Sequence, residues 1–502
     1  MTRYGFLIDQ DTCIGCHACT VACKAEHDVP LGVNRTWVKY IESGSFPDVS
    51  RHFAVMRCNH CDDAPCVTIC PTGALFHRDN GIVDFDTSNC IGCKSCMNAC
   101  PYDALYIDPV DHTAQKCNFC AHRVDVGLQP SCVAVCPTQS IVAGDLDDPS
   151  SRISQMIATH DVVVRAPEQN TRPKLFYKGV DPAAIDPTRT AIAADGMVWT
   201  ETTRGHPTMP VTDHEPLART TYTTAHPAPW GWMVTAYLVT KAIAAGALLI
   251  AVLEVLLGHA GSHGVVGTMP AIVAGTFTAV TGVLLVADLK QPRRFLYLLT
   301  RPNWSSWLVR GAIVLALYAG LAAAWFVLAL AQSERALQIL ATPAALAAAA
   351  AAGYTAFLFG QCEGRDLWQT RWLLPDLLAQ AVVAGAALFG LADLVLDVPE
   401  ADAIRWTLIA GLIVHLAVVA AEVAGHHSRH VAAALRVMTR GREAPYFWSG
   451  VATALLAVGF AALAIAGVAA LAFTACASFA ALVAITSSEA AFVRAGQAVP
   501  LS

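Results

Sequence analysis

Charged residues are scarce in this sequence, and the scarcity is concentrated in its second half. Only 14% of the 502 residues are Asp, Glu, Lys or Arg, against roughly 25% in an ordinary soluble domain. Residues 1–225 carry 18 Lys and Arg and 26 Asp and Glu, whereas residues 226–502 carry 15 and 13. This imbalance excludes a wholly soluble protein and predicts one soluble module followed by one membrane module. The mild net charge of −6 gives no indication of a nucleic-acid partner.

Cysteine is nearly absent after residue 136. Sixteen of the eighteen cysteines lie between Cys13 and Cys136, and only Cys362 and Cys476 follow. The start of the sequence lacks a basic stretch followed by an apolar one, and it lacks a twin-arginine pair. We therefore expect no secretory signal and a soluble module in the reducing cytoplasm, where disulfides are disfavoured. The clustering of the cysteines must have another chemical reason.

The clustered cysteines fall into four groups of four. The first and third groups share the spacing C-x2-C-x2-C-x3-C, the second widens the middle gap to four residues, and the fourth widens it to eleven. The run C-x2-C-x2-C-x3-C-P is typical of ferredoxins, in which three cysteines bind one [4Fe–4S] cluster and the fourth binds the other cluster of a pair. Sixteen thiolates match four such clusters. Structural zinc is the alternative, but zinc sites need neither the third cysteine nor a proline after the fourth.

These spacings, over residues 4–145, resemble the four-cluster electron-transfer subunits of molybdenum oxidoreductases, such as DMSO, polysulfide and nitrate reductases and formate dehydrogenases. The resemblance implies that groups one and four pair, as do groups two and three, and that the last cysteines are exchanged within each pair. The implied ligand sets, numbered 1 to 4, are Cys13, Cys16, Cys19 and Cys136; Cys117, Cys120, Cys132 and Cys23; Cys58, Cys61, Cys66 and Cys100; and Cys90, Cys93, Cys96 and Cys70. The resemblance also implies a catalytic partner of the molybdopterin type beside set 1 and the membrane beside set 3.

Residues 146–229 contain no cysteine and ten prolines. This composition is typical of an extended connector that is ordered in part by docking. We therefore divide the sequence into a four-cluster ferredoxin-like domain at 1–145, the connector at 146–229, a membrane anchor at 230–487 and a C-terminal tail at 488–502.

Apolar runs predict the membrane helices. Six runs lie near residues 232–257, 269–287, 307–331, 343–360, 373–396 and 404–424. A further charge-free stretch, 447–485, has 39 residues, nearly twice what about 30 Å of hydrocarbon requires, so we expect a hairpin that breaks near Gly467. The predicted fold is an α+β tandem ferredoxin-like iron–sulfur module followed by an all-α, NrfD-like bundle of eight transmembrane helices. Gly246 and Gly385 indicate close packing between helices of this bundle.

Basic residues are distributed unequally between the two ends of the predicted spans. Arg335 and Arg405 lie at the end away from the soluble module, and ten basic residues lie at the other. By the positive-inside rule, we expect a multi-pass protein of the inner (cytoplasmic) membrane with the iron–sulfur module facing the cytoplasm. The alternative is that these residues only dock the module onto the bundle. The ten are Lys290, Arg293, Arg294, Arg301, Arg365, Arg371, Arg429, Arg436, Arg440 and Arg442.

Two segments of the second half, 288–312 (DLKQPRRFLYLLTRPNWSSWLVRGA) and 363–388 (EGRDLWQTRWLLPDLLAQAVVAGAAL), resemble the quinone-reactive NrfD-type membrane subunits of polysulfide reductases. The resemblance covers residues 230–487. It implies an anchor without haem that exchanges electrons with menaquinone or ubiquinone near the face that carries the cluster module. The histidines are consistent with an anchor without haem. A b-type haem between helices usually takes two histidine ligands, and only His415 lies well inside a predicted span.

Polar and aromatic groups of the spans and the cluster-side loops are the candidates for quinone binding. A quinone needs hydrogen-bond donors to its carbonyls and a route for two protons. Lys241 and Tyr237 share one face of the first span. The candidate set is Tyr237, Lys241, Asp288, Trp304, Tyr354, His415 and Glu422. The alternative for Lys241 is a structural ion pair with an acid such as Asp288.

The sequence therefore predicts an electron-transfer and membrane-anchor subunit that fuses two usually separate parts. We expect it to link a molybdenum or tungsten catalytic subunit, which carries out the substrate chemistry, to the quinone pool through four [4Fe–4S] clusters. The alternative is a redox-driven, ion-translocating complex that resembles alternative complex III. A polar chain across the whole bilayer would favour the pump, whereas polar groups confined to the cluster side would favour a plain quinone reductase.

Overall fold

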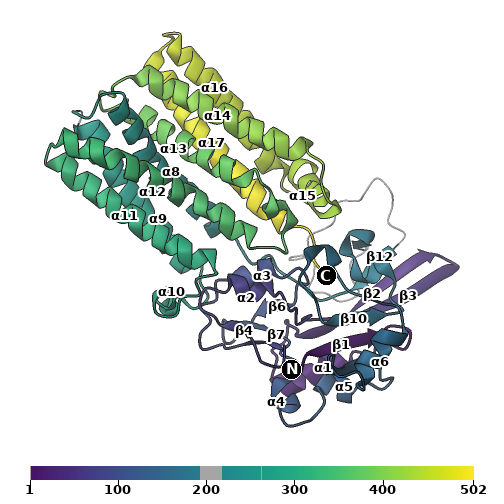
Figure 1. The fold of residues 1–502 in the computed structure, drawn as a ribbon. Helices are drawn as coiled ribbons and strands as arrows, with labels where there is room; N and C mark the ends of the chain where they lie inside the picture. Colours follow the sequence, from purple (N-terminus) through teal and green to yellow (C-terminus); the bar gives the residue numbers. More distant parts are fainter. Residues whose placement is uncertain (1, 193–217, 262) are drawn as a thin grey trace.

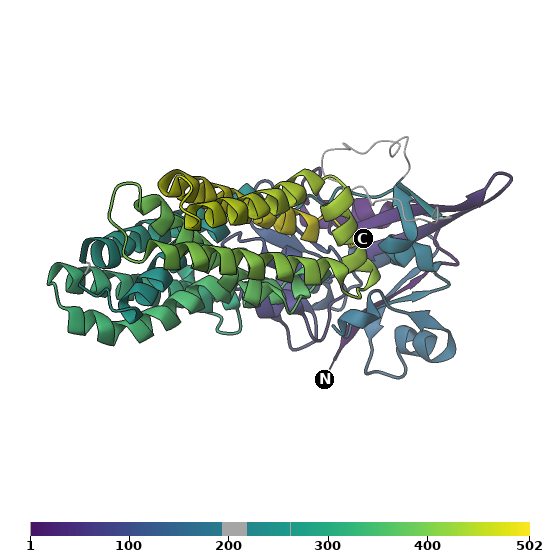
Figure 2. The same ribbon diagram turned by 90° about the horizontal axis from the view of Figure 1, so that it is seen from above.

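The computed structural model describes residues 2–192, 218–261 and 263–502. An α/β module built from the first part of the sequence lies at one end of a long helical bundle built from the second part (Figure 1). The view from above shows the same arrangement, with the bundle on one side and the module on the other (Figure 2). Both termini lie at the module end of the molecule (Figure 1).

The module contains a four-stranded sheet in the order β8–β1–β10–β9. β1 (Tyr4–Asp9) pairs antiparallel with β8 (Ile141–Asp145) and parallel with β10 (Leu175–Lys178), and β9 (Val162–Val163) pairs with β10. Four consecutive residues of β1 are buried, because Phe6 and Ile8 pack into the main core while Leu7 packs on the other face against Ile153. The sheet therefore joins strands from the start of the sequence to strands that follow the cysteine groups.

A second sheet has the order β11–β12–β2–β3. Its centre is a long hairpin of β2 (Thr36–Ser45) and β3 (Asp48–Arg57), and β12 (Ala218–Tyr222) and β11 (Thr190–Ile192) extend it. The hairpin projects from the module on the side away from the bundle (Figure 1).

Two smaller units repeat one pattern, a short helix followed by a short hairpin. α2 (Pro65–Ile69) precedes β4 (Leu75–His77) and β5 (Val83–Phe85), and α3 (Ser95–Ala99) precedes β6 (Leu105–Ile107) and β7 (Ala114–Lys116). The other cysteine groups are carried by α1 (Ala18–His27), α4 (Ala121–Val124) and α5 (Ser131–Ala134). These repeated units confirm the predicted tandem ferredoxin-like module.

Eight helices among the described residues are long and apolar enough to cross a membrane, as predicted. α8 and α13 are the most buried of them and form the centre of the bundle. A Cβ on Gly246 of α8 would lie 2.1 Å from the Ala381 carbonyl oxygen, and one on Gly385 would lie 2.2 Å from the Gly246 oxygen. These glycines therefore allow the two central backbones to touch. The eight helices are α8 (Trp232–Leu256), α9 (Met269–Ala287), α11 (Trp307–Leu330), α12 (Glu334–Gly360), α13 (Leu373–Ala392), α14 (Ala401–Ala424), α16 (Ala444–Ile465) and α17 (Ala470–Gly496).

The helix boundaries differ from the apolar runs at two places. α12 begins at Glu334 rather than near residue 343, because an acid in the first turn favours a helix N-terminus although it lowers the hydropathy. α17 continues to Gly496, beyond the predicted anchor boundary at 487. Between α16 and α17 the backbone turns at Gly467, which has a φ of 79° and confirms the predicted hairpin.

The predicted connector contains regular structure. Residues 146–192 include α6 (Arg152–Thr159), α7 (Pro182–Ile185) and strands of both sheets. The part of the connector at 193–217 lies outside the described residues. After α17 the backbone returns to the module, where Nη2 of Arg165 donates a hydrogen bond of 2.6 Å to the Leu501 carbonyl oxygen. Two short helices, α10 (Tyr297–Thr300) and α15 (Arg429–Arg440), lie at the module end of the bundle (Figure 1).

Candidate functional site

The cysteines of the module gather around separate cavities. One cavity is lined by the four cysteines of set 1, another by set 3 and another by set 4. In set 2, Cys23 interacts electrostatically with Cys132 and Cys120, and Cys117 interacts with Cys23 and Cys132. The fold thus gathers the same four sets that the family resemblance implied. No three His, Cys, Asp or Glu side chains of the described ranges are grouped to hold a single metal ion.

The chemistry of these thiols fits a bound iron–sulfur group. Burial raises the pKa of Cys19 to about 11, and burial together with neighbouring thiols raises the pKa of Cys23 to about 12. Thiolates buried this deeply are unfavourable unless a cationic centre binds them. Backbone N–H groups of Gly92 and Ala114 donate to Cys90 Sγ over 3.4 Å, as expected around a thiolate ligand.

Set 4 faces the bundle. The backbone carbonyls of its cysteines accept hydrogen bonds from Asn303 Nδ2 to Cys70 (2.8 Å), Arg294 Nη1 to Cys90 (2.9 Å) and Trp230 Nε1 to Cys93 (3.3 Å). Set 3 approaches the bundle through Cys100, whose carbonyl oxygen would lie 2.6 Å from a Cβ on Gly364. Both sets therefore contact the bundle, and the expectation that set 3 lies beside the membrane stays a prediction.

The joint between module and bundle also accounts for Asp288. Its carboxylate accepts a hydrogen bond of 2.8 Å from Lys94 of the module. The alternative in which Asp288 pairs with Lys241 is therefore wrong. Beside this ion pair, Gly92 has a φ of 69°, and a Cβ there would lie 2.6 Å from the Lys290 Cβ. The module and the loop after α9 are thus in tight contact.

Aromatic side chains continue from this joint into the bundle. Trp230 stacks on Trp368 with ring centroids 5.3 Å apart. Trp368 packs edge-on against Phe359 at 4.6 Å, and its Nε1 donates to the Phe492 carbonyl oxygen. Phe492 in turn lines a pocket among α13, α14, α15, α16 and α17. A packed path therefore leads from Cys93 to this pocket.

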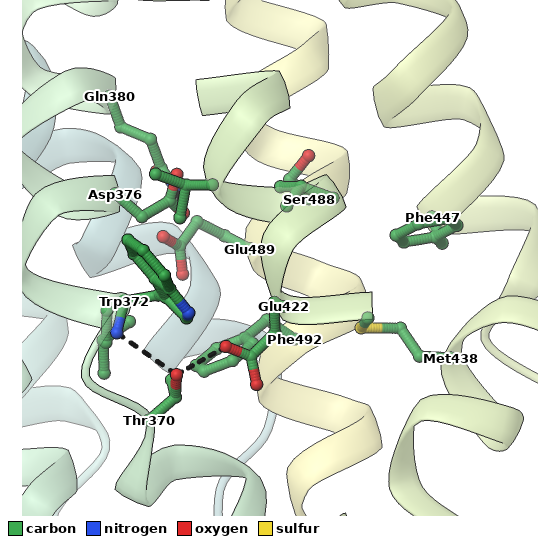
Figure 3. Close-up of a pocket in the computed structure, with 13 residues that line it drawn as sticks. Thr370, Trp372, Asp376, Gln380, Glu422, Met438, Phe447, Ser488, Glu489 and Phe492 are labelled. Atoms are coloured by element: carbon green, nitrogen blue, oxygen red, sulfur yellow. Dashed lines mark hydrogen bonds between the residues drawn. The ribbon is translucent and has the colours of Figure 1, made fainter. Parts of the chain in front are cut away.

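The pocket is apolar on one side and acidic on the other. Figure 3 shows Asp376 and Glu489 close together on one side, with Phe447 and Met438 across the pocket. Glu422 is on the wall and accepts a hydrogen bond from the Thr370 hydroxyl. The full lining is Thr370, Trp372, Leu373, Asp376, Gln380, Val418, Val419, Glu422, Met438, Phe447, Ser488, Glu489 and Phe492.

His415 supports the acidic side of the pocket from behind. Its Nδ1 lies 2.6 Å from an oxygen of Asp376, and its Nε2 lies 3.3 Å from Ser488 Oγ. Gln380 Nε2 donates to the other oxygen of Asp376 over 2.8 Å. This arrangement connects a carboxylate of the pocket to a buried group that can hold or release a proton.

Lys241 is outside the pocket lining and has contacts of its own. Its Nζ donates to the Ala352 carbonyl oxygen over 2.8 Å and to the Thr355 hydroxyl, and it lies 4.9 Å from the ring centroid of Tyr354. Lys241 also interacts electrostatically with Glu489, as does Tyr237. Glu489 is therefore the group that links the Lys241 neighbourhood to the pocket.

The structure thus divides the seven sequence candidates. Glu422 lines the pocket and His415 contacts it, whereas Tyr237, Lys241 and Tyr354 gather beside Glu489. Asp288 belongs to the joint with the module, and Trp304 is 60% exposed.

Sequence reasoning missed Asp376 and Glu489. Each is a single acid close to the end of an apolar run, where a charge is easily taken as part of a loop. A signal existed for Asp376, because Gln380 follows it at the i, i+4 spacing that places both on one helix face.

The basic residues at the module end have two roles. Arg294 and Arg365 bind the module, through carbonyls of Thr87 and Cys90 and through the Asn98 side chain. Others, such as Arg293, Arg301 and Arg440, are exposed. Docking onto the module therefore accounts for only part of the excess of basic residues at this end of the bundle.

Taken together, the cysteine sets and the eight apolar helices define a multi-pass membrane protein that carries an iron–sulfur module. Comparison with known families agrees. Two models described as 4Fe-4S dicluster domains match residues 12–75 and 49–146. A model described as "Polysulphide reductase, NrfD" matches residues 220–500, which is more than half of the sequence, and the protein belongs to this family.

Curated relatives are subunits of reductases or their homologues. The B subunit of tetrathionate reductase from Salmonella typhimurium is 43% identical over 189 residues, 37% of this protein and 76% of that one. Protein NrfC of Escherichia coli (strain K12) is 46% identical over 178 residues, 35% of this protein and 79% of that one. The B subunit of polysulfide reductase from Wolinella succinogenes is 40% identical over 177 residues, 35% of this protein and 93% of that one. Each match spans most of the relative and about a third of this protein, as expected when such a subunit is fused to a membrane anchor.

Proposed function

We propose that this protein passes electrons between a molybdopterin-type catalytic partner and membrane quinone, menaquinone or ubiquinone, through four [4Fe–4S] clusters. The observation that carries the proposal is the packed path from the set 4 cysteines through Trp230 and Trp368 to the acidic pocket of the bundle. The clusters would supply one-electron transfer when bound. The protein itself supplies the cysteine thiolates, joins the module to the bundle and surrounds the pocket.

The pocket suits a quinone. Quinone reduction takes two electrons and two protons, so the site needs apolar walls for the ring and groups that exchange protons at the two oxygens. Phe447 and Met438 supply apolar wall, and Asp376 and Glu489 supply carboxyl groups. His415 behind Asp376 gives a second proton-holding group.

The exposure of set 1 supports a partner protein. Cys16 is exposed and Cys13 and Cys136 are partly exposed, whereas all four cysteines of set 3 are buried. Set 1 therefore lies where a second redox protein could approach. The relatives are named as subunits of tetrathionate and polysulfide reductases, which supports a reductase of this kind as the partner.

The distribution of polar groups favours the quinone reductase over the ion pump. At the far end of the bundle, Arg405 pairs with Asp393 and bonds to Thr474 of α17. Between Ser478 and Ser488 of α17, the buried residues are Ala481, Ala484 and Ile485, all apolar. Along α17, about 15 Å of helix therefore separates the two polar regions.

The basic residues support a cytoplasmic position for the iron–sulfur module, in the inner membrane. Alkaline phosphatase, which is active only outside the cytoplasm, tests this when it is fused after Ser502. We expect an inactive fusion, and an active fusion inserted at residues 397–400 between α13 and α14 serves as the control. The opposite pattern would place the module outside.

Iron analysis of the anaerobically purified full-length protein tests the four clusters. We expect about sixteen iron and sixteen labile sulfide per molecule. Cys93→Ser should remove one cluster signal in EPR and leave that of set 1, while Cys476→Ser, outside the sets, should change nothing. Zinc in place of iron, or about eight iron, would contradict the proposal.

Glu489→Gln tests the pocket. We expect quinol-dependent reduction of the clusters to slow at least about 100-fold, because proton exchange at the quinone loses a carboxyl group. Dithionite should still reduce all clusters. Thr486→Val, on the exposed face of α17, is the control. Normal quinol-dependent rates in Glu489→Gln would mean that the quinone binds at another site.

A further inference from the structure

Arg57 is an unusual group in the module, a fully buried arginine that contacts a cysteine sulfur. It is the last residue of β3, its exposed fraction is 0%, and its Nη1 donates a hydrogen bond of 3.0 Å to Cys132 Sγ of set 2. The guanidinium also lies 4.6 Å from the ring centroid of Phe6. Packing against Phe6 holds the guanidinium in place, so its charge has a fixed position relative to the sulfur.

The charge of Arg57 lies between two cysteine sets. It interacts electrostatically with Cys132 and Cys117 of set 2, and with Cys19 of set 1. Its Nε and Nη2 are buried and have no hydrogen-bond partner among the described residues. A buried guanidinium with two donors left over is costly unless a negatively charged group lies beside it. A cluster ligated by four thiolates would be such a group.

Sets 3 and 4 receive neutral donors at their sulfurs. The backbone N–H of His60 donates to Cys58 of set 3, and those of Gly92 and Ala114 donate to Cys90 of set 4. In set 2, His27 also lies 3.2 Å from Cys120 Sγ. Among the described residues, Arg57 is the one Arg or Lys side chain that donates a hydrogen bond to a sulfur of the four sets.

We propose that Arg57 raises the reduction potential of the cluster held by set 2, which rests on the four clusters proposed above. When that site takes up one electron, no bond forms or breaks and no proton is required, so its negative charge grows by one. A fixed positive charge at hydrogen-bond distance favours the reduced form. Arg57 acts through Cys132, to which it donates.

A redox titration followed by EPR tests the proposal on the full-length protein, with dithionite as reductant. The signal of set 2 is first assigned by its loss in Cys120→Ser. In Arg57→Gln, we expect this signal to titrate at lower potential and to shift more than any other, with at least a tenfold change in the reduction equilibrium, which is 59 mV for one electron. Arg51→Gln is the matched control, since Arg51 lies on the same strand but is exposed and paired with Glu42.

Arg57→Lys keeps the charge and loses the planar fork, and it decides the result if Arg57→Gln does not assemble its clusters. We expect its set 2 signal to move in the same direction by a smaller amount, about threefold in the equilibrium. Unchanged potentials at full iron content would overturn the role of Arg57, as would an equal shift of all four signals. Iron well below sixteen in the wild-type protein would instead contradict the four-cluster proposal.

Discussion

The module and the bundle bury charge in different ways. The module buries cationic side chains close to cysteines and carbonyl groups, including Lys39, Arg57, Lys116, Arg165 and Lys174. The bundle buries mainly acids, and near one end the buried Glu422 and Glu489 line a pocket together with the partly buried Asp376. Positive charge suits a region that stores electrons on metal–sulfur groups, and carboxyl groups suit a region that exchanges protons with a quinone.

The module and the bundle are also stabilised by different interactions. Several helices of the module that carry cysteines are short, such as α2 and α3 with five residues each, and cysteines form much of its core. The helices of the bundle are long, and alanine and glycine allow their backbones to approach. The module should therefore depend on its bound groups, and the bundle on close packing alone.

Removal of iron should give the largest effect. We expect oxidative removal with a chelator to unfold the module, because its many buried thiols cannot be satisfied by the short elements around them. The bundle should keep its helices. Limited proteolysis with mass spectrometry should show cuts throughout 12–145 and protection from 232 onward. Equal protection of both regions would show that the module folds without iron.

Lys241→Ala tests whether the buried cation of the bundle takes part in quinone chemistry. We expect quinone-dependent turnover to fall at least about 100-fold, because Lys241 interacts electrostatically with Glu489, the carboxyl group proposed to exchange protons with the quinone. The clusters should remain reducible by dithionite. Arg440→Ala, which removes an exposed basic residue at the module end, is the control. Normal turnover would restrict Lys241 to its bonds with Ala352 and Thr355, and would leave Tyr354, His415 and Glu422 as the sequence candidates.

Gly246→Leu tests the packing of the two central helices. A leucine there would push against the Ala381 carbonyl and the backbone of Gly385, so α8 and α13 must separate. We expect a loss of about 3 kcal/mol or more, seen as a lower melting temperature in detergent. Gly282→Leu on α9, where a Cβ has open space around it, should be close to neutral. Equal behaviour of the two variants would contradict close helix contact.

Local patterns predicted the cysteine groups and the membrane helices well. Cluster spacing is a property of a few adjacent turns, and an apolar run needs no partner to be recognised. Features that depend on contacts between segments far apart in the sequence were missed. Spacing could not show that set 4 rather than set 3 faces Trp230 and Asn303. Composition likewise indicated a connector at 146–229, although β10 pairs with β1 in the structure, in a register that matches Phe6 with Leu175.

The pocket shows the same limit. Glu489 follows a long apolar run and stands near the expected end of the last span, so its charge suggested a tail. In the structure it is buried, because α17 extends to Gly496 and neighbouring helices supply Gln380 and Lys241. A single charge at a helix end can therefore be a functional group or a boundary, and only the surrounding helices decide.

Substitution of Lys39 should give the smallest effect. Lys39 is a buried lysine of the module, as Lys241 is of the bundle. Burial and the nearby Arg165 lower the pKa of Lys39 to about 7, although Asp186 acts in the opposite direction. An unfolded lysine has a pKa of about 10.4, so between pH 7 and 10 the unfolded state holds more protons and stability rises with pH. Lys39→Met should therefore stabilise the protein by about 2 kcal/mol at pH 6, and the gain should shrink as the pH approaches 10. Melting temperatures of the full-length protein between pH 6 and 10 measure this, with the exposed Lys290→Met as control. A gain that does not change with pH would mean that Lys39 has the same pKa in the folded and unfolded states, so that burial in the module does not disfavour its charge.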